Sequence, residues 1–245
     1  MNQNFIVHEK IYQKKNLVSL IHKSRLQAIR KLFEKHISVS EITWADFGCS
    51  NGFITEEIVR ANSFNFSKIV GYDHLEGLLE LARAKKIPNT EFKYFNLNEV
   101  SNVAERFDLV TCFETLEHVG DLENAFMNLF NHLGKKGTLI ITVPNETGFI
   151  GLIKFLGRLA VRRNPYRDFF FKMSYYRYMK YLLRNEFIDI FREPNQPGYG
   201  PHLGFDYRKL EEYLKNKYLK NKKLDLRDKF FSDLKMNVAY VLIKQ

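Results

Sequence analysis

The chain has 245 residues, of which 45% are hydrophobic and 15% aromatic, enough for one large α/β domain or a smaller domain with an elaboration. Its formal net charge of +10 favours anionic partners such as phosphorylated substrates, nucleic acid or acidic lipid headgroups. Two cysteines and the lack of any apolar run of about 18 residues argue against a disulfide framework, a zinc ribbon and a membrane-spanning helix, so we expect a cytoplasmic protein.

The first expected element is a helix over residues 17–36, where apolar residues recur at helical spacing between basic ones. Short β-rich segments then alternate with helical ones: strands are expected at 41–48, 67–73, 90–96, 106–113 and 136–144, and helices at 53–61, 75–86 and 122–134. This alternation predicts right-handed βαβ crossovers and a parallel sheet with helices on both faces. Asp121 is the expected N-cap of the helix at 122–134, and Gly134 its C-terminal stop.

Aromatic and basic residues dominate from residue 146 to 204, which predicts a helical insertion. Lys154, Arg158 and Arg162 are four residues apart, a basic stripe on an otherwise apolar helix. Residues 147–163 suit peripheral contact with the inner face of a membrane, or a lid over a substrate. The aromatic and basic run that follows suits single-stranded nucleic acid, a lipid phosphate or a nucleotide sugar, or a cap that packs on the domain.

The α/β pattern resumes with a helix at 205–218 and strands at 222–228 and 237–245. The expected division is therefore a helical lead-in at 1–40, a ligand-binding core at 41–145, the insertion as a substrate cap at 146–204, and a C-terminal part at 205–245 that completes the sheet.

Ligands of open parallel sheets bind at the carboxyl ends of the strands. The first strand runs into D-F-G-C-S-N-G, where Gly48 and Gly52 permit a tight turn and close approach of backbone N–H groups to a ligand. The dinucleotide fingerprint G-x-G-x-x-G is absent, which argues against pyrophosphate binding. The second strand ends in Asp73, whose carboxylate can accept hydrogen bonds from both hydroxyls of a ribose.

Four motifs, DFGCSNG, GYDHLEGLLELARAK, FKYFNLNE and the run from FDLVTCFETLEH to TVPN, follow one another in an order that resembles the class I S-adenosylmethionine-dependent methyltransferases. The resemblance covers about residues 40–145. It implies an α/β, Rossmann-like fold with a mostly parallel seven-stranded sheet, helices on both faces and a helical cap. It also implies S-adenosylmethionine as the cofactor.

The resemblance carries over residue by residue. The turn after the first strand would surround the methionine part of the cofactor, Asp73 would bind the ribose, and Phe113 with Glu114 would close the site after the fourth strand. Asn96 and Leu97 would lie beside the adenine. The full set of expected cofactor residues is Asp46, Gly48, Cys49, Ser50, Asn51, Gly52, Asp73, His74, Asn96, Leu97 and Phe113.

Two residues depart from the family pattern. Ser50 stands where glycine is usual, so a positive φ there would cost on the order of 1 kcal/mol. Asn96 stands where aspartate is common, and its amide can still form a hydrogen bond with adenine.

Glu114, Glu117 and His118 occupy positions i, i+3 and i+4, which would share one face of a helical turn. Two carboxylates and an imidazole suit Mg, Mn, Fe or Zn. The stretch E-T-L-E-H resembles an element of ubiquinone-pathway O-methyltransferases and of small-RNA 2'-O-methyltransferases that is associated with a divalent metal. His202 resembles a later histidine of the RNA branch and would join the set.

Two interpretations of these residues do without a metal. Glu114 and His118 would act as catalytic residues, with His118 as a general base or orienting group, or the pair would only support the loop. The expected activity is methyl transfer to an oxygen of an anionic small metabolite, glycan or lipid-linked precursor. The alternatives are an RNA 2'-O-methyltransferase and a catalytically idle binding module on the same scaffold.

Overall fold

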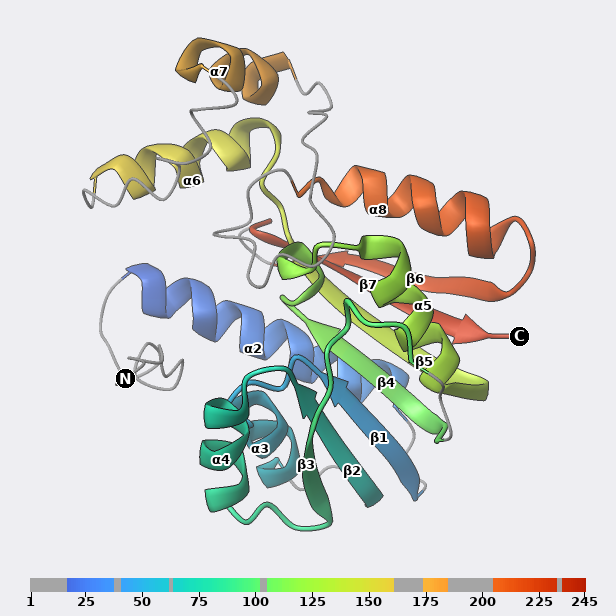
Figure 1. Ribbon diagram of the computed structural model, residues 1–245. Coiled ribbons are helices and arrows are strands. Elements are labelled where there is room, and N and C mark those ends of the chain that lie inside the picture. The colour runs from blue at the N-terminus through green and yellow to red at the C-terminus, as the bar shows by residue number, and fades with distance from the viewer. Residues whose placement is uncertain are drawn as a thin grey trace.

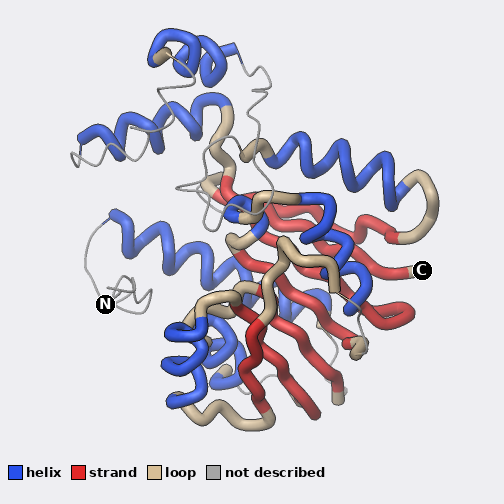
Figure 2. The backbone as a smooth tube through the Cα atoms, viewed as in Figure 1, coloured by secondary structure: helices blue, strands red, loops and turns tan. Residues whose placement is uncertain are grey.

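The structure is a computed structural model of the 245-residue chain. It describes residues 17–37, 41–61, 64–101, 105–160, 174–184, 205–232 and 235–245. Figures 1 and 2 show that these residues form a single twisted sheet with helices on both of its faces.

The sheet has seven strands in the order β3-β2-β1-β4-β5-β7-β6. The strands are β1 (Ile42–Phe47), β2 (Phe66–Asp73), β3 (Thr90–Tyr94), β4 (Phe107–Phe113), β5 (Leu133–Pro144), β6 (Leu224–Phe231) and β7 (Asn237–Lys244). β7 pairs antiparallel with β5 and β6, and all other strand pairs of this sheet are parallel. The predicted seven-stranded, mostly parallel sheet is therefore confirmed. The strand order reverses between β1 and β4, which places a ligand site at their carboxyl ends.

The described helices occur where the sequence pattern changes from a period of two to a period of 3.6. They are α2 (Leu17–His36), α3 (Phe53–Arg60), α4 (Glu76–Ala84), α5 (Leu122–His132), α6 (Gly148–Ala160), α7 (Tyr175–Arg184) and α8 (Tyr207–Leu214). A 3₁₀ turn, η1 (Leu116–His118), precedes α5, and a π-helical turn, η2 (Lys215–Leu219), continues α8. None of the described helices is long and apolar enough to span a membrane.

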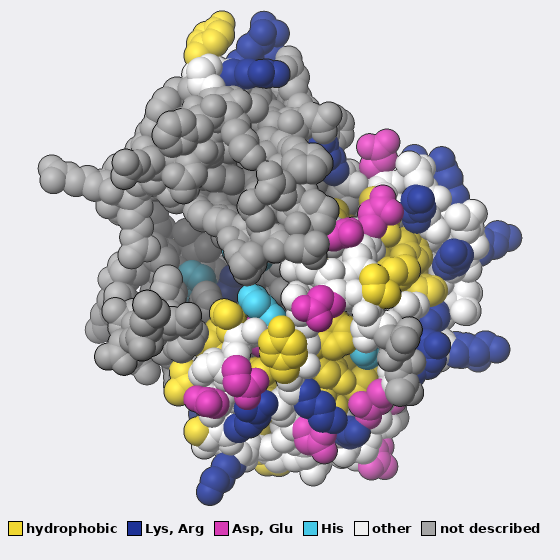
Figure 3. All heavy atoms as spheres, in the orientation of Figure 1, with side chains coloured by type: hydrophobic (Ala, Val, Ile, Leu, Met, Phe, Trp, Pro, Cys, Tyr) yellow, Lys and Arg dark blue, Asp and Glu magenta, His cyan; other side chains and the backbone are white. Residues whose placement is uncertain are grey.

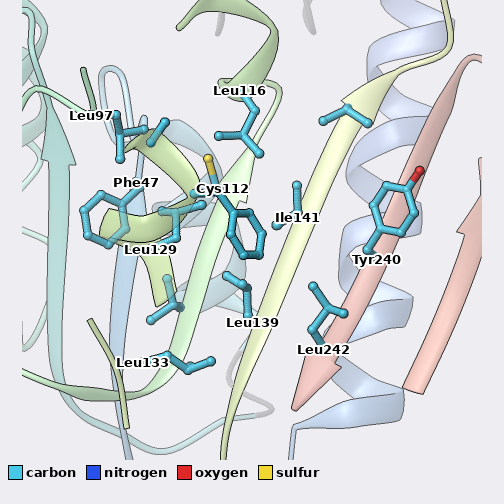
Figure 4. Packing of buried hydrophobic residues seen from close by; sticks show 14 of the residues in the cluster. Phe47, Leu97, Cys112, Leu116, Leu129, Leu133, Leu139, Ile141, Tyr240 and Leu242 are labelled. Atoms are coloured by element: carbon cyan, nitrogen blue, oxygen red, sulfur yellow. The ribbon is translucent and has the colours of Figure 1, made fainter. Parts of the chain in front are cut away.

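Each face of the sheet carries its own apolar layer, because successive side chains of a strand point to opposite faces. Helices α5 and α8 pack on one face, and Figure 4 shows Leu129 of α5 in the same layer as Phe47 and Ile141. On the other face Phe33 of α2 packs edge-on against Trp44, with ring centroids 5.3 Å apart. Both of these side chains are fully buried, and burial of Phe33 contributes about 2–3 kcal/mol.

Helix α2 has the predicted bounds, residues 17–36. Its C-terminal half is held to the sheet by Ile29, Leu32 and Phe33, which lie at i, i+3 and i+4 and are all buried. Leu20, in the other half, is 57% exposed. Leu26 is only 7% exposed, and His22 and Arg25 near it line a cavity at the carboxyl end of the sheet.

The two ends of α5 differ in how well the sequence predicts them. Asp121 is the N-cap, as expected, and its side chain accepts a hydrogen bond of 2.9 Å from the Asn124 N–H. Gly134 is not the helix stop, because α5 ends at His132 and the chain passes directly into β5. The glycine instead lies in β5, where a Cβ would come 3.1 Å from the Phe107 carbonyl oxygen of the neighbouring strand.

The segment after β5 begins with a helical pair. Phe155 of α6 packs on Tyr178 of α7, with ring centroids 5.4 Å apart. Lys154 Nζ donates to Glu146 Oε1 at 3.1 Å and to the Met236 carbonyl oxygen at 2.9 Å. Lys154 therefore does not serve as part of an exposed basic stripe, because its ammonium is held by the buried carboxylate of Glu146 and by the Met236 carbonyl oxygen. The Arg158 side chain and Arg162 lie outside what the structure describes.

Candidate active site

A cavity of about 820 Å³ lies at the carboxyl ends of β1 to β4. The loops after these four strands line it, and residues of α2 line it from the side. Figure 3 shows a hollow on this face of the molecule, with histidine side chains at its edge. The cavity lies next to the reversal of strand order between β1 and β4, as expected for an open α/β sheet.

The turn after β1 forms the floor of one end of the cavity. Gly48, Ser50 and Gly52 all have positive φ, at 76°, 53° and 70°. The Gly48 and Cys49 N–H groups donate to the Tyr72 carbonyl oxygen at 2.7 and 3.0 Å, which ties the turn to β2. Ser50 thus adopts the backbone conformation for which the sequence predicts strain.

Asp73 terminates β2 beside this turn. Its Oδ2 accepts a hydrogen bond of 2.9 Å from the Ser50 N–H, and its Oδ1 accepts one of 3.0 Å from the Leu75 N–H. The carboxylate is only 8% exposed and lines the cavity. Since each oxygen has further acceptor capacity, a ribose diol can bind to it without displacing these backbone contacts.

Asp46 lies deeper, near the end of β1. Its two oxygens accept hydrogen bonds of 2.7 Å from the hydroxyls of Thr55 and Thr111, and Trp44 Nε1 donates to Thr111 at 2.8 Å. Burial raises the pKa of Asp46 to about 6, although the two hydroxyl groups oppose the rise. The network fixes the end of β1 directly beneath the glycine turn.

The loop after β3 lines the far end of the cavity. Asn96 Oδ1 accepts from the Asn98 N–H at 3.1 Å, and its Nδ2 donates to Glu99 Oε1 at 2.8 Å. The Leu97 carbonyl oxygen accepts from Nδ2 of Asn124 and Asn128, both at 3.1 Å. These contacts hold the loop against α5.

The loop after β4 also lines the cavity. Glu114 has a φ of 50°, unusual for a residue other than glycine. Its Oε2 accepts a hydrogen bond of 2.5 Å from Asn237 Nδ2 and lies 3.6 Å from Arg25 Nη1 of α2. The side chain of His118, four residues on, is 41% exposed and also lines the cavity. A carboxylate and an imidazole therefore border the same space as the glycine turn.

The sequence pattern did not indicate two polar cavity residues of α2. His22 and Arg25 of α2 line the cavity, and Arg25 Nη2 lies 3.1 Å from His22 Nδ1. Their i, i+3 spacing was visible, but on an amphipathic helix that spacing is also typical of a solvated face. The sequence alone does not show that the helix at 17–36 will lie beside the ends of these strands.

All predicted cofactor residues except Gly52 line the cavity. Gly52 belongs to the same turn but is buried behind it, where a Cβ would come 2.9 Å from Phe92. Glu114 and His118, the predicted catalytic pair, also line the cavity.

The predicted metal set does not assemble. Glu117 is completely buried and does not line the cavity, although its Oε1 lies 4.0 Å from His118 Nε2. The reason is local: residues 116–118 form a 3₁₀ turn and Glu114 precedes it with positive φ, so the spacing no longer maps to one face. Among the described residues no three His, Cys, Asp or Glu side chains are placed to hold a metal ion. His202 lies outside the described residues.

Comparisons with known proteins agree with this geometry. The chain is 31% identical over 124 residues to the ubiquinone biosynthesis O-methyltransferase of Rickettsia akari, covering 50% of this chain and 47% of that protein. It is 24% identical over 133 residues to the malonyl-[acyl-carrier protein] O-methyltransferase of Bacillus anthracis, covering 54% and 49%. Each alignment thus spans about half the length of the relative.

The fold has solved counterparts. Magnesium protoporphyrin IX methyltransferase from Synechocystis, with bound S-adenosylhomocysteine, superimposes with a TM-score of 0.62 over 97% of this chain and 93% of that one, at 12% identity. The family model described as "Methyltransferase domain" matches residues 20–196. Because that match spans most of the chain and includes every motif of the cavity, the chain belongs to the methyltransferase domain family of class I S-adenosylmethionine-dependent methyltransferases.

Proposed function

We propose that this protein transfers the methyl group of S-adenosylmethionine to an oxygen atom of a small metabolite. The observation that carries the proposal is one cavity that joins the glycine turn and Asp73 at one side to Glu114 and His118 at the other. Oxygen as the acceptor atom is supported by the relatives, which are O-methyltransferases by name. The cavity volume of about 820 Å³ is within the usual range for sites of small ligands.

The chain's own residues fit the cofactor. Asp73 would accept the ribose hydroxyls, and Asn96 with Leu97 would lie beside the adenine. The positive φ of Gly48 lets the backbone pass close to the methionine part, since no side chain stands in the way. Asp46 would lie beneath it as a buried carboxylate held by two threonine hydroxyls.

S-adenosylmethionine supplies a methyl group on a sulfonium, which the acceptor oxygen displaces in line, so that the S–C bond breaks as the O–C bond forms. In this protein His118 would accept the hydroxyl proton of the acceptor, and Glu114 would orient that hydroxyl. Glu114 suits an orienting role because Asn237 and Arg25 hold its Oε2 from two sides. Alignment is the main task of such an enzyme, since the reaction needs little charge stabilisation beyond the proton transfer.

No step is assigned to a metal, because no three His, Cys, Asp or Glu side chains of the described residues are placed to hold one. Titration with Mn²⁺, followed by water-proton relaxation, should therefore reveal no stoichiometric site that depends on Glu114. A stoichiometric site that disappears in Glu114→Gln would contradict this and restore the predicted metal set.

The stretch 146–204 is proposed as the cap over the acceptor, and the division of the chain into four parts remains a prediction. In support of a cap, α6 starts directly after β5 and Lys154 fixes it to the sheet. Phe149, Ile153 and Leu156 of α6 are 72%, 42% and 51% exposed, an apolar stripe that supports acceptor or membrane contact in this stretch. Sedimentation with anionic vesicles, compared in wild type and Phe149→Ser, tests the membrane part.

The decisive experiment is binding of S-adenosylhomocysteine by calorimetry, followed by methyl transfer from labelled S-adenosylmethionine to a panel of hydroxylated small molecules. Binding with transfer to an oxygen supports the proposal. No binding well above micromolar concentrations would favour an idle scaffold. Tight binding of single-stranded RNA that weakens steeply with salt would instead favour an RNA 2'-O-methyltransferase, the candidate that the net charge of +10 keeps open.

A further inference from the structure

Arg25 and His22 are polar residues of the cavity wall. Both line the cavity from α2, and Arg25 Nη1 is 3.6 Å from Oε2 of Glu114 in the loop after β4. The same loop contacts the glycine turn, because a Cβ at Gly48 would come within 2.0 Å of Thr115 Oγ1. The Arg25 guanidinium is therefore close to the side of the cavity at which the methyl group would be transferred.

Arg25 and His22 together form a donor surface. A guanidinium can only donate hydrogen bonds, so at 3.1 Å from Arg25 Nη2 the Nδ1 atom of His22 must accept. In the neutral ring the proton of His22 is then on Nε2. One permanent positive charge and an imidazole thus border the cavity.

Apolar side chains of α2 pack against the sheet. The helix is anchored by Ile29, Leu32 and Phe33, which are all nearly or fully buried. The Arg25 side chain is only 17% exposed, so its guanidinium is partly withdrawn from water at the wall of the cavity. A cation held at the cavity wall suits contact with an anionic group of a ligand.

We propose that Arg25, assisted by His22, binds a carboxylate or phosphate group of the methyl acceptor and so determines its specificity. This inference rests on the proposed function and narrows its substrate class to small molecules that carry an oxyanion near the methylated hydroxyl. The planar guanidinium can engage two oxygens of either group at once. Glu114 stays in place meanwhile, because Asn237 Nδ2 holds its Oε2 at 2.5 Å.

The test uses the full chain saturated with S-adenosylhomocysteine, and acetate and inorganic phosphate as separate probes. The ring protons of His22 are followed by NMR, with His22→Gln to assign the signal, at constant ionic strength set by chloride. In the wild-type protein one or both anions should shift the His22 signal in a saturable manner. Arg25→Gln should weaken this binding about tenfold or more, because it removes a charge-assisted contact.

Arg30→Gln is the matched control. Arg30 lies on the same helix, but it pairs with Glu57 of α3 at 2.6 Å and does not line the cavity. Its substitution removes the same charge and should leave anion affinity within about twofold, since only long-range attraction is lost. The anion affinity of Arg25→Lys should lie between those of wild type and Arg25→Gln. Lysine keeps the positive charge but lacks the planar guanidinium that can bind two oxygens at once.

The outcomes separate the two proposals. If the wild-type protein does not bind S-adenosylhomocysteine, the proposed function fails. If all variants bind it equally and Arg25→Gln binds both anions as the wild type does, the function stands and the role of Arg25 is refuted. Equal weakening by Arg30→Gln and Arg25→Gln would also refute it, because the effect would then be one of net charge. Should Arg25→Gln fail to fold, Arg25→Lys and His22→Gln, read by acetate and phosphate displacement in calorimetry, decide the same question.

Discussion

Thr115 packs directly on Gly48: a Cβ added to Gly48 would come within 2.0 Å of Thr115 Oγ1 and 2.6 Å of its Cγ2. The loop that carries Glu114 and His118 is thereby held against the turn proposed to bind the methionine part of the cofactor. Thr115 is itself fixed, since its hydroxyl donates to the Phe113 carbonyl oxygen at 3.0 Å. The contact between Thr115 and Gly48 therefore links the loop after β4 to the turn after β1.

We expect Gly48→Ala to destabilise the protein by about 2–4 kcal/mol, of which about 1 comes from the positive φ and about 1–3 from overpacking against Thr115. For a chain of this size, that corresponds to a fall in Tm of roughly 5–15 °C. Adding Thr115→Ala should recover the overpacking part only. Gly157→Ala is the control: nothing lies within 4 Å of its added Cβ, so this change within α6 should be neutral or stabilising. Equal Tm losses for the two alanine variants would contradict the packing argument.

The fold and the cofactor side of the cavity were predictable because they depend on local pattern and chain order. The bounds of α2, the N-cap Asp121 and the strand-end carboxylate Asp73 follow from periodicity and from the chemistry of single residues. A parallel α/β sheet then brings successive strand ends to one edge without further information.

The acceptor side was not predictable in the same way, because it depends on contacts between distant segments. Glu117 seemed to share a face with Glu114 and His118, but a positive φ at Glu114 and a 3₁₀ turn send it into the core. Arg25 lies near Glu114 only because α2 crosses the carboxyl end of the sheet, 89 positions earlier in the chain. Neither a backbone outlier nor such a tertiary contact leaves a periodic signal in the sequence.

Ser50→Gly should stabilise the protein. Ser50 has a φ of 53°, which costs a residue with a Cβ about 1 kcal/mol, although glycine loses part of this gain through its freer unfolded state. We expect a net gain of at most about 0.6 kcal/mol in the free energy of unfolding, measured by urea denaturation. Affinity for S-adenosylhomocysteine should not change, because the Ser50 N–H that donates to Asp73 is kept. Ser50→Ala retains the strain, and a gain in that variant as large as in Ser50→Gly would show that φ is not the cause.

Asp73→Ala should lower the affinity for S-adenosylhomocysteine at least about tenfold, through loss of the proposed ribose contacts, each a hydrogen bond to a charged group. It also removes acceptors for the Ser50 and Leu75 N–H groups, so some loss of stability is expected. Asp121→Ala supplies the control, since Asp121 likewise accepts a backbone N–H, that of Asn124, but lies outside the cavity lining. Its stability should fall by about 1 kcal/mol while its affinity stays at the wild-type value. Wild-type affinity in Asp73→Ala would refute the assignment of the ribose site.

The raised pKa of Asp46 predicts how the free energy of unfolding of the ligand-free protein depends on pH. Because burial raises its pKa from 3.8 to about 6, the folded protein between these values holds a proton that the unfolded chain has released. The contribution of Asp46 to stability is therefore fully present below about pH 4, is lost as the pH rises to about 6, and changes little above that. The shift of about two units corresponds to at most about 3 kcal/mol.

Asp46→Asn cannot ionise, so its free energy of unfolding relative to wild type should increase by up to about 3 kcal/mol between pH 4 and pH 7, as measured by urea unfolding at half-unit steps. Asp228→Asn provides a control of opposite sign, because the hydrogen bond from Lys35 lowers the pKa of Asp228, and stability conferred by that carboxylate is lost as the pH falls. Relative to wild type, Asp228→Asn should therefore lose stability as the pH rises through the same acidic range. Parallel pH profiles for wild type and Asp46→Asn would mean that Asp46 is ionised in the folded protein at acidic pH, and that the threonine hydroxyls outweigh its burial.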